Sequence, residues 1–249
     1  MILATASPER AATKGPGRLS RALVRLFMRH ATVAACETIA DRFRLITLEG
    51  PALADIAWTP GQKLQIAMGS AFVARTYTPI EWDPVAGRTR ILGYAHGDGP
   101  GSAWVRGLEP GDECDVFGPR HSLDPNAAAG PLALLGDETS IGLARALRSS
   151  DRTGAVACRF EVDDVDATRR VMENLGLDDA ALFARSEDGA HIRGIEAALP
   201  ALDAAGATFV LTGKASTIQQ LRLALKSRAV PAARIVAKAY WAPGKTGLD

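Results

Sequence analysis

The sequence lacks the features that stabilise small secreted proteins or anchor a chain in a membrane. Its 249 residues include only three cysteines, Cys36, Cys114 and Cys158, with no Cys-x-x-Cys pair and no Cys/His cluster. This argues against a disulfide scaffold, a zinc site and a cysteine-held iron–sulfur cluster, and we predict no metal ligand. No apolar run reaches about 18 residues and the N-terminus has no apolar signal core, so we expect a cytoplasmic protein without a membrane span.

The chain also lacks a large net charge. Lys and Arg number 29 and Asp and Glu 28, which gives +1 and no general attraction to nucleic acid or to a membrane surface. The charge is nevertheless uneven, since residues 1–30 carry +5, residues 214–249 carry +6, and the part between them carries −10. Such asymmetry indicates a site for a charged ligand. For the oligomeric state we expect a monomer.

The apolar pattern divides the chain near residues 30 and 125. The segment 1–30 is an arm that ends in a short amphipathic helix over Arg18–His30, which we expect to pack on the protein itself rather than on a membrane. Between 31 and 125, six short apolar runs separated by turn residues predict a small antiparallel barrel or sandwich. From 126 to 249, apolar runs alternate with helical segments, which predicts a parallel αβ sheet.

One predicted strand ends in RTYTPI, residues 75–80, which suits a flavin dinucleotide. Arg75 offers a bidentate cation to a pyrophosphate, and Tyr77 can stack on a flat ring. Strand alternation places these two on one face and Thr76 and Thr78 on the other, with the Thr78 hydroxyl available to the flavin edge. An exposed edge strand would look the same.

A glycine-rich loop follows at HGDGPGSAWVRG, residues 96–107. Glycines such as Gly97 and Gly99 let the backbone approach an anion, and a helix that starts near Ser102 supplies N–H groups and a hydroxyl. A plain strand-to-helix turn is the alternative. The arginine strand and this loop together are more specific than either alone.

The second half opens with LLGDETSIG, residues 134–142, at the end of a predicted parallel strand. Gly136 makes the turn, Asp137 or Thr139 can cap the next helix, and this edge of an αβ sheet binds nucleotides. The Gly-x-Gly-x-x-Gly fingerprint is absent, so a simple capped helix stays open as the alternative. Glu161, 25 residues after Gly136, is a candidate partner for the ribose of NADH.

The C-terminal part combines aromatic and basic residues. Lys214 follows another strand end, and the neighbours Tyr240 and Trp241 lie between Lys238 and Lys245 in a chain with only 6% aromatic residues. The pattern indicates either a ligand-facing edge or a solvated basic tail.

Six segments, in this order and spacing, resemble the siderophore-interacting proteins, the ferric-siderophore reductases of the ferredoxin-reductase-like superfamily. They are RTYT (75–78), HGDGPGSAW (96–104), PGDECDVFGP (110–119), LLGDET (134–139), TGKAS (212–216) and KAYWAPGKTGLD (238–249). The resemblance implies a six-stranded antiparallel FAD-binding barrel over 31–125, followed by an NAD(P)H-binding-like αβ domain over 126–249. It also implies a flavoenzyme that reduces Fe(III) in a siderophore to Fe(II). Electrons would pass through FAD from NADH, NADPH or a ferredoxin.

The resemblance further assigns residues to roles. Tyr77 and Thr78 would be catalytic, and four cations, Lys63, Lys214, Lys238 and Lys245, would meet the ferric chelate. The predicted cofactor-binding residues are Arg75, Thr76, Tyr77, Thr78, His96, Gly97, Gly99, Ser102, Asp137, Thr139 and Trp241. The chain departs from many relatives at Gln65, Lys214 and Ala242, which leaves the cationic set and the electron donor open.

Two other functions remain possible from the sequence. The chain would fit a flavin reductase module that serves a separate protein acceptor, or a siderophore-binding protein without catalytic activity.

Overall fold

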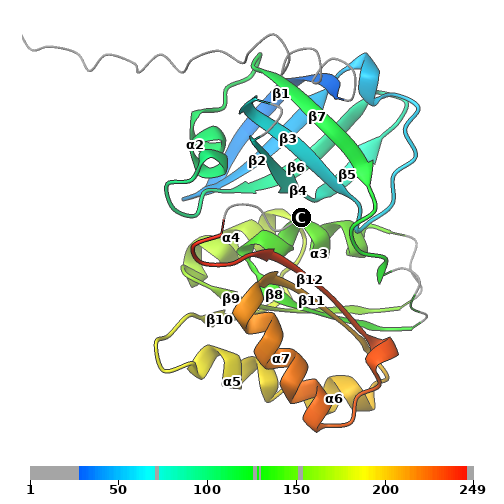
Figure 1. Cartoon of the computed structure of the whole chain (residues 1–249), viewed down its shortest axis with the longest axis vertical. Coiled ribbons are helices and arrows are strands. Elements are labelled where there is room, and N and C mark those ends of the chain that lie inside the picture. The colour runs from blue at the N-terminus through cyan, green and yellow to red at the C-terminus, as the bar shows by residue number, and fades with distance from the viewer. Residues whose placement is uncertain (1–27, 71–72, 126–127, 129, 151–153, 246–249) are drawn as a thin grey trace, which may run out of the picture.

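Two β-sheets of different kinds organise the chain (Figure 1). The computed structural model describes residues 28–70, 73–125, 128, 130–150 and 154–245. Strands β1 to β7 form an antiparallel sheet, and strands β8 to β12 form a parallel sheet flanked by helices. The predicted order of an antiparallel barrel followed by a parallel αβ unit is therefore confirmed.

The antiparallel sheet has the strand order β4-β3-β7-β1-β2-β6-β5. Its elements are β1 (Arg29–Ala40), β2 (Phe43–Glu49), η1 (Pro51–Leu53), β3 (Lys63–Ser70), β4 (Val73–Tyr77), β5 (Pro79–Asp83), β6 (Arg88–Tyr94), α2 (Pro100–Gly107) and β7 (Glu113–Arg120). The two edge strands, β4 and β5, are consecutive and only Thr78 separates them, so one bent strand pairs with β3 at one end and with β6 at the other. This bend joins the two edges into a barrel. It also divides one of the six predicted strands into β4 and β5, so the sheet has seven strands.

The parallel sheet has the order β10-β9-β8-β11-β12. Its elements are β8 (Leu132–Asp137), η3 (Glu138–Ser140), α3 (Ile141–Arg148), β9 (Val156–Val162), α4 (Val165–Asn174), β10 (Ala181–Ala184), α5 (Ala190–Glu196), α6 (Leu199–Ala204), β11 (Thr208–Lys214), α7 (Ala215–Ser227), η4 (Ala232–Arg234) and β12 (Ile235–Trp241). The direction of winding changes between β8 and β11, which is where open αβ sheets bind ligands.

Side-chain alternation in β8 explains why both faces of this sheet are covered. Leu132 and Leu134 pack in a core with α3 and α4, whereas Ala133 and Leu135 pack in a second core with α5, α6 and α7. Helices α3 and α4 lie between the sheet and the barrel, and the other three lie on the far side (Figure 1). Because both faces of β8 are buried, the strand is apolar until Gly136.

The barrel and the parallel sheet share one apolar core. Phe43 and Ile80 from the barrel belong to the same buried cluster as Ile141 and Leu143 of α3. A Cβ at Gly142 would lie 3.3 Å from the Ile80 side chain, so this glycine lets α3 pack closely on β5. The approach holds the edge of the barrel against the carboxyl edge of the parallel sheet.

The N-terminal predictions fall largely outside the described residues. The arm and most of the helix predicted over Arg18–His30 lie there. Arg29 and His30, which that prediction placed in the helix, instead begin β1 and pair with β7. The domain boundary near residue 125 and the monomeric state stay predictions. Among the described residues, no helix is long and apolar enough to cross a bilayer.

Truncation of Phe43 tests the shared core. Phe43 is 2% exposed and its ring stacks on Tyr94 with centroids 4.6 Å apart. Phe43→Ala should lower the free energy of unfolding by about 3–5 kcal/mol, measured by urea denaturation. Val85, which is 92% exposed, provides the control, and Val85→Ala should change it by less than about 0.5 kcal/mol. A similar small effect for both variants would contradict a shared core.

Candidate functional site

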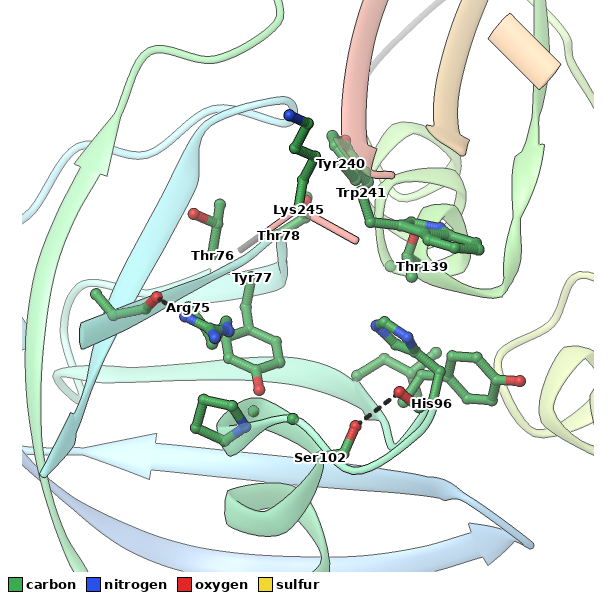
Figure 2. A pocket seen from close by; sticks show the side chains of 17 residues that line it. Arg75, Thr76, Tyr77, Thr78, His96, Ser102, Thr139, Tyr240, Trp241 and Lys245 are labelled. Carbon is green, nitrogen blue, oxygen red and sulfur yellow. Dashed lines mark hydrogen bonds between the residues drawn. The ribbon is translucent and has the colours of Figure 1, made fainter. Parts of the chain in front are cut away.

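A cavity of about 340 Å³ lies where the barrel meets the carboxyl edge of the parallel sheet (Figure 2). Its volume is typical of small-molecule sites. It is lined by Ala74, Arg75, Thr76, Tyr77, Thr78, Leu92, Tyr94, His96, Gly99, Pro100, Gly101, Ser102, Thr139, Gly142, Tyr240, Trp241 and Lys245. The cavity therefore brings together residues from the arginine strand, the glycine loop, the β8 turn and the C-terminal strand.

The bent edge strand forms one wall. Arg75, Thr76, Tyr77 and Thr78 all line the cavity, and the regular pairing of residues 74–77 with β3 keeps Arg75 and Tyr77 on one face of the strand and Thr76 on the other, before the strand turns at Thr78. The ring of Tyr77 packs 5.5 Å from that of Trp104. Burial raises the pKa of Tyr77, so its hydroxyl keeps its proton at neutral pH and can donate a hydrogen bond.

The N-terminus of α2 lies beside Arg75. Gly99 is the N-cap, Pro100 opens the helix, and the first-turn N–H groups that follow have no acceptor within the helix. A Cβ at Gly101 would lie 3.0 Å from Cγ of Arg75, so glycine at this position lets the helix end approach the arginine. A guanidinium next to a helix N-terminus fits an anionic pyrophosphate.

The predicted loop residues have different places around this helix. Ser102 lines the cavity, and its hydroxyl donates to the carbonyl of His96 at 3.1 Å (Figure 2). Gly97 has φ +81° and its carbonyl accepts from Arg106, but it does not line the cavity. Its contribution is the turn that leads the chain from His96 into the helix.

Tyr240 and Trp241 form the opposite wall, from β12. Burial raises the pKa of Tyr240 to about 12, and its interaction with the Thr78 side chain opposes this rise. Tyr240 was not among the predicted site residues, although the pair of adjacent aromatic residues was a visible signal. This interaction connects the last strand of the parallel sheet with the bend of the barrel.

His96 lies between two aromatic rings of the wall. Its imidazole centroid is 5.8 Å from that of Tyr94 and 5.5 Å from that of Trp241. Burial lowers the pKa of His96, which keeps the ring neutral at pH 7. A neutral ring adds flat surface to the cavity without adding charge.

Asp137 is fully buried and does not line the cavity. Its carboxylate accepts from the backbone N–H of Thr139 at 2.9 Å, from the Thr139 hydroxyl, and from Nε1 of Trp241 at 2.8 Å. Burial raises its pKa to about 6, and the hydrogen bonds from Thr139 and Trp241 oppose this rise. Asp137, which was predicted to contact the cofactor, therefore lies behind Thr139 and Trp241 and does not face the cavity.

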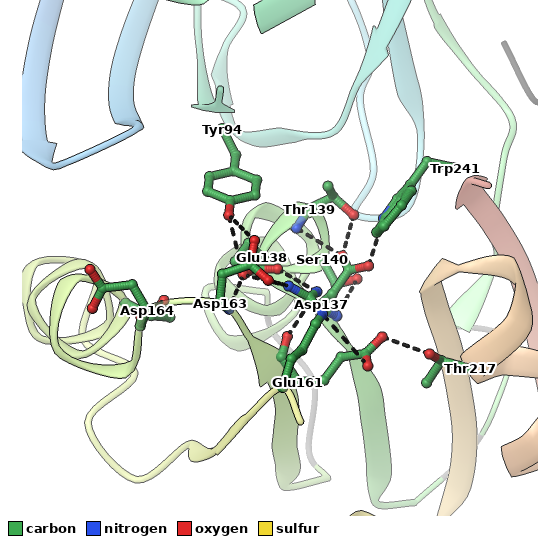
Figure 3. Close-up of polar contacts among 12 residues, drawn as sticks. Tyr94, Asp137, Glu138, Thr139, Ser140, Glu161, Asp163, Asp164, Thr217 and Trp241 are labelled. Atoms are coloured by element: carbon green, nitrogen blue, oxygen red, sulfur yellow. Dashed lines mark hydrogen bonds and ion pairs between the residues drawn. The ribbon is translucent and has the colours of Figure 1, made fainter. Parts of the chain in front are cut away.

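A second hollow of about 230 Å³ adjoins the first along Tyr94, His96, Thr139 and Trp241. Its polar wall is an ion-pair network (Figure 3), in which Arg185 donates to Glu138 at 2.7 and 3.0 Å and also pairs with Asp163. Arg185 follows β10 and was missed from the sequence, where a lone arginine gives no signal. It holds the carboxyl ends of neighbouring parallel strands together.

Glu161 does not reach either hollow. It is 1% exposed, and its carboxylate oxygens lie 2.7 Å from the Thr217 hydroxyl and 3.1 Å from Nε2 of His191. The suggestion that Glu161 binds a ribose is therefore not supported by its position.

The four predicted chelate-binding lysines are only partly brought together. Lys245 lines the large cavity, and Lys214 lines the second hollow with its Nζ 5.8 Å from the Trp241 ring centre. Lys63 is 8% exposed within β3. Lys238 lies in β12, opposite Thr212 of the neighbouring strand. Neither lysine lines either of the two hollows. Among the described residues, no group of His, Cys, Asp and Glu is arranged to hold a metal ion.

Comparison with known proteins identifies the barrel. The family model of the siderophore-interacting FAD-binding domain matches residues 62–123. The resemblance to siderophore-interacting proteins is confirmed over this segment. The segment contains the arginine strand and the glycine loop, and the prediction of FAD as cofactor is confirmed with it. No curated protein matches the chain.

Solved structures share the whole architecture. A siderophore utilization protein from T. fusca is 24% identical, with a TM-score of 0.67 over 89% of this chain and 95% of its own. The siderophore-interacting protein SipS from Aeromonas hydrophila is 21% identical, with a TM-score of 0.66 over 88% and 93%. Phthalate dioxygenase reductase is 18% identical, with a TM-score of 0.66 over 88% of this chain and 70% of its own. These likenesses establish the ferredoxin-reductase-like fold, and with the family model they support a flavin-dependent reductase.

Proposed function

We propose that this protein is a flavoenzyme that reduces Fe(III) bound in a siderophore to Fe(II) and so releases the iron. The observation that carries the proposal is one cavity, within and beside the matched FAD-binding segment, that joins an anion site to an aromatic wall. The anion site consists of Arg75 and the N-terminus of α2, and the wall consists of Tyr240 and Trp241.

Different residues of the cavity would bind different parts of FAD. Arg75, Gly99 and Ser102 would hold the pyrophosphate of FAD, while Tyr77 and Thr78 lie further along the same strand toward Tyr240. Bound FAD would supply the exchange between a two-electron donor and a one-electron acceptor, so that one NAD(P)H reduces two ferric ions.

The ferric substrate would arrive at the basic rim. Lys214 and Lys245 border the two hollows on the side of Trp241, and their charge attracts an anionic chelate. The chelator keeps the iron coordinated, so the protein needs to supply no metal ligand. Siderophore oxygen donors hold hard Fe(III) more tightly than Fe(II), so reduction loosens the complex.

The electron donor would meet the carboxyl edge of the parallel sheet. This edge, at the change of winding between β8 and β11, is the usual nucleotide position in such sheets, and it supports NADH or NADPH as donor. The fold is shared with phthalate dioxygenase reductase, described as transferring electrons from pyridine nucleotides to a 2Fe–2S centre. A ferredoxin donor, or a protein acceptor in place of the chelate, is the competing function. The free cysteines Cys36, Cys114 and Cys158 agree with a reducing compartment such as the cytoplasm.

Arg75→Ala tests the FAD site. Loss of the guanidinium beside the α2 N-terminus should raise the dissociation constant for FAD about ten- to a hundredfold, measured from flavin fluorescence during titration of the apoprotein. Arg90→Ala is the matched control, because Arg90 is an arginine of the same barrel paired with Glu81 at 3.1 Å. Equal dissociation constants for FAD in the two variants would show that Arg75 does not contribute to FAD binding.

Anaerobic turnover tests the reaction. The FAD-loaded protein should be reduced by NADH or NADPH, seen as bleaching of the flavin band, and should be reoxidised on mixing with a ferric hydroxamate, catecholate or carboxylate chelate. Fe(II) captured by a ferrous-specific chromophore should equal two ions per NAD(P)H. Reoxidation that is faster with an iron–sulfur protein than with every chelate would favour the protein-acceptor function. A protein that binds chelate but no flavin would indicate a binding protein.

Charge reversal tests the basic rim. Lys214→Glu and Lys245→Glu should each raise the KM for an anionic ferric chelate about three- to tenfold at low ionic strength, with FAD content unchanged and a smaller effect at high salt. Lys226→Glu makes the same charge change at an exposed site on α7 and should leave the KM unaltered. The same KM increase in all three variants would point to net charge rather than to a chelate site.

A further inference from the structure

Asp137 makes more contacts than a helix cap requires. One carboxylate oxygen accepts from the N–H and the hydroxyl of Thr139, which is the ordinary capping arrangement at η3. The other oxygen accepts from Nε1 of Trp241, which is 104 residues away on β12. Thr139 and Trp241 both line the large cavity and Asp137 does not, so each wall residue is held from behind by the same carboxylate (Figure 3).

A glycine in the neighbouring backbone makes room for the Asp137 carboxylate. Gly213 has φ +97°, and a Cβ there would lie 2.4 Å from the Asp137 oxygen that accepts from Trp241. A side chain at 213 would therefore displace the carboxylate as well as strain the backbone. Position 213 is therefore a glycine because the Asp137 carboxylate occupies the space that a side chain would need.

The polarity of these hydrogen bonds affects what the cavity can bind. An ionised carboxylate only accepts hydrogen bonds, so the hydroxyl of Thr139 must donate its hydrogen bond to Asp137. Toward the cavity the Thr139 oxygen then offers lone pairs alone. A ligand group that faces Thr139 is favoured when it carries an N–H or O–H, and disfavoured when it is itself an acceptor.

We propose that Asp137 is a positioning residue, which acts on the bound ligand only through Trp241 and Thr139. It fixes the indole of Trp241 as a wall of the cavity and makes the Thr139 oxygen an acceptor toward the ligand. The part of this inference that concerns FAD rests on the proposed function, whereas the part that concerns the orientation of Trp241 does not.

The ionisation of Asp137 gives an independent signal. Burial, together with the charge of Glu138, raises its pKa to about 6, while Thr139, Trp241 and the charge of Arg185 lower it. Two other titratable side chains lie nearby. Tyr240 stays neutral at this pH, whereas His96, whose imidazole centroid is 5.5 Å from that of Trp241, gains a proton as the pH falls, so the titration is repeated in His96→Gln to isolate the contribution of Asp137. Above pH 6 the carboxylate is ionised and accepts from Trp241, and below pH 6 a growing fraction carries its own proton and holds Trp241 less tightly.

The first experiment follows the indole N–H of Trp241 by ¹H–¹⁵N correlation NMR in the apoprotein, with the resonance assigned by its loss in Trp241→Phe. The signal should lie downfield of an unbonded indole N–H and should titrate near pH 6. Trp82 is the internal control, because its Nε1 donates to the neutral carbonyl of Leu53 at 3.1 Å and should not follow this titration. An indole signal of Trp241 at the position of an unbonded indole N–H at every pH between 4.5 and 8 would overturn the proposal.

The second experiment is a double-mutant cycle on FAD binding. In Asp137→Asn the remaining oxygen can still cap Thr139, but the new NH₂ group faces the N–H of Trp241, so only the link to the indole is broken. We expect about tenfold weaker FAD binding in Asp137→Asn and in Trp241→Phe. The double variant should be no weaker than Trp241→Phe alone.

The outcomes separate the two proposals. Additive losses in the cycle would show that Asp137 acts by another route and would overturn the positioning role. Absence of FAD binding in the unsubstituted protein would overturn the proposed function, while the NMR titration would still decide the positioning of Trp241. If Asp137→Asn does not fold, that titration in the unsubstituted protein decides alone.

Discussion

The bend of one strand at Thr78 is the constraint on which the rest of the site depends. It closes the barrel, because the residues before it pair with β3 and those after it pair with β6. It also contacts the parallel-sheet unit, where Gly142 lets α3 approach and Tyr240 interacts with Thr78. The bend therefore places the end of this edge strand, from Arg75 to Thr78, along the cavity.

Buried charge at the edge of the parallel sheet is tolerated because each carboxylate has a partner. Glu138 is 2% exposed and would be costly to ionise alone, but Arg185 and the N–H of Asp163 contact it directly. Tyr94 extends the network into the barrel by donating to Glu138 and Asp163. The network holds the edge in one arrangement, and the removal of one partner would leave an uncompensated charge rather than a harmless gap.

The sequence predicted the elements well and the site in part. Six apolar runs became the barrel, and the arginine strand and glycine loop meet as expected because both belong to local motifs with fixed backbone requirements. The prediction was weaker for residues whose place depends on contacts across the chain. Lys63 looked like a cation at the rim but is buried in β3, and Arg185 carried no local signal although it organises three strand ends. Charge alone does not reveal which side of a strand faces a cavity.

The distribution of cations around the cavity separates the two ligands of the proposed reaction. Arg75 lies on the edge strand of the barrel, next to a helix N-terminus that suits an anion. Lys214 and Lys245 lie instead beside Trp241 on the parallel sheet and at the turn after β12, on long side chains suited to an incoming anion of variable shape. Between them the lining is aromatic and neutral, since Tyr77, Tyr240 and His96 are all held in their uncharged forms by burial. In the proposed reaction the pyrophosphate would therefore meet Arg75 at one end, the chelate would meet the two lysines at the other, and the neutral, aromatic lining between them suits an uncharged flat ring.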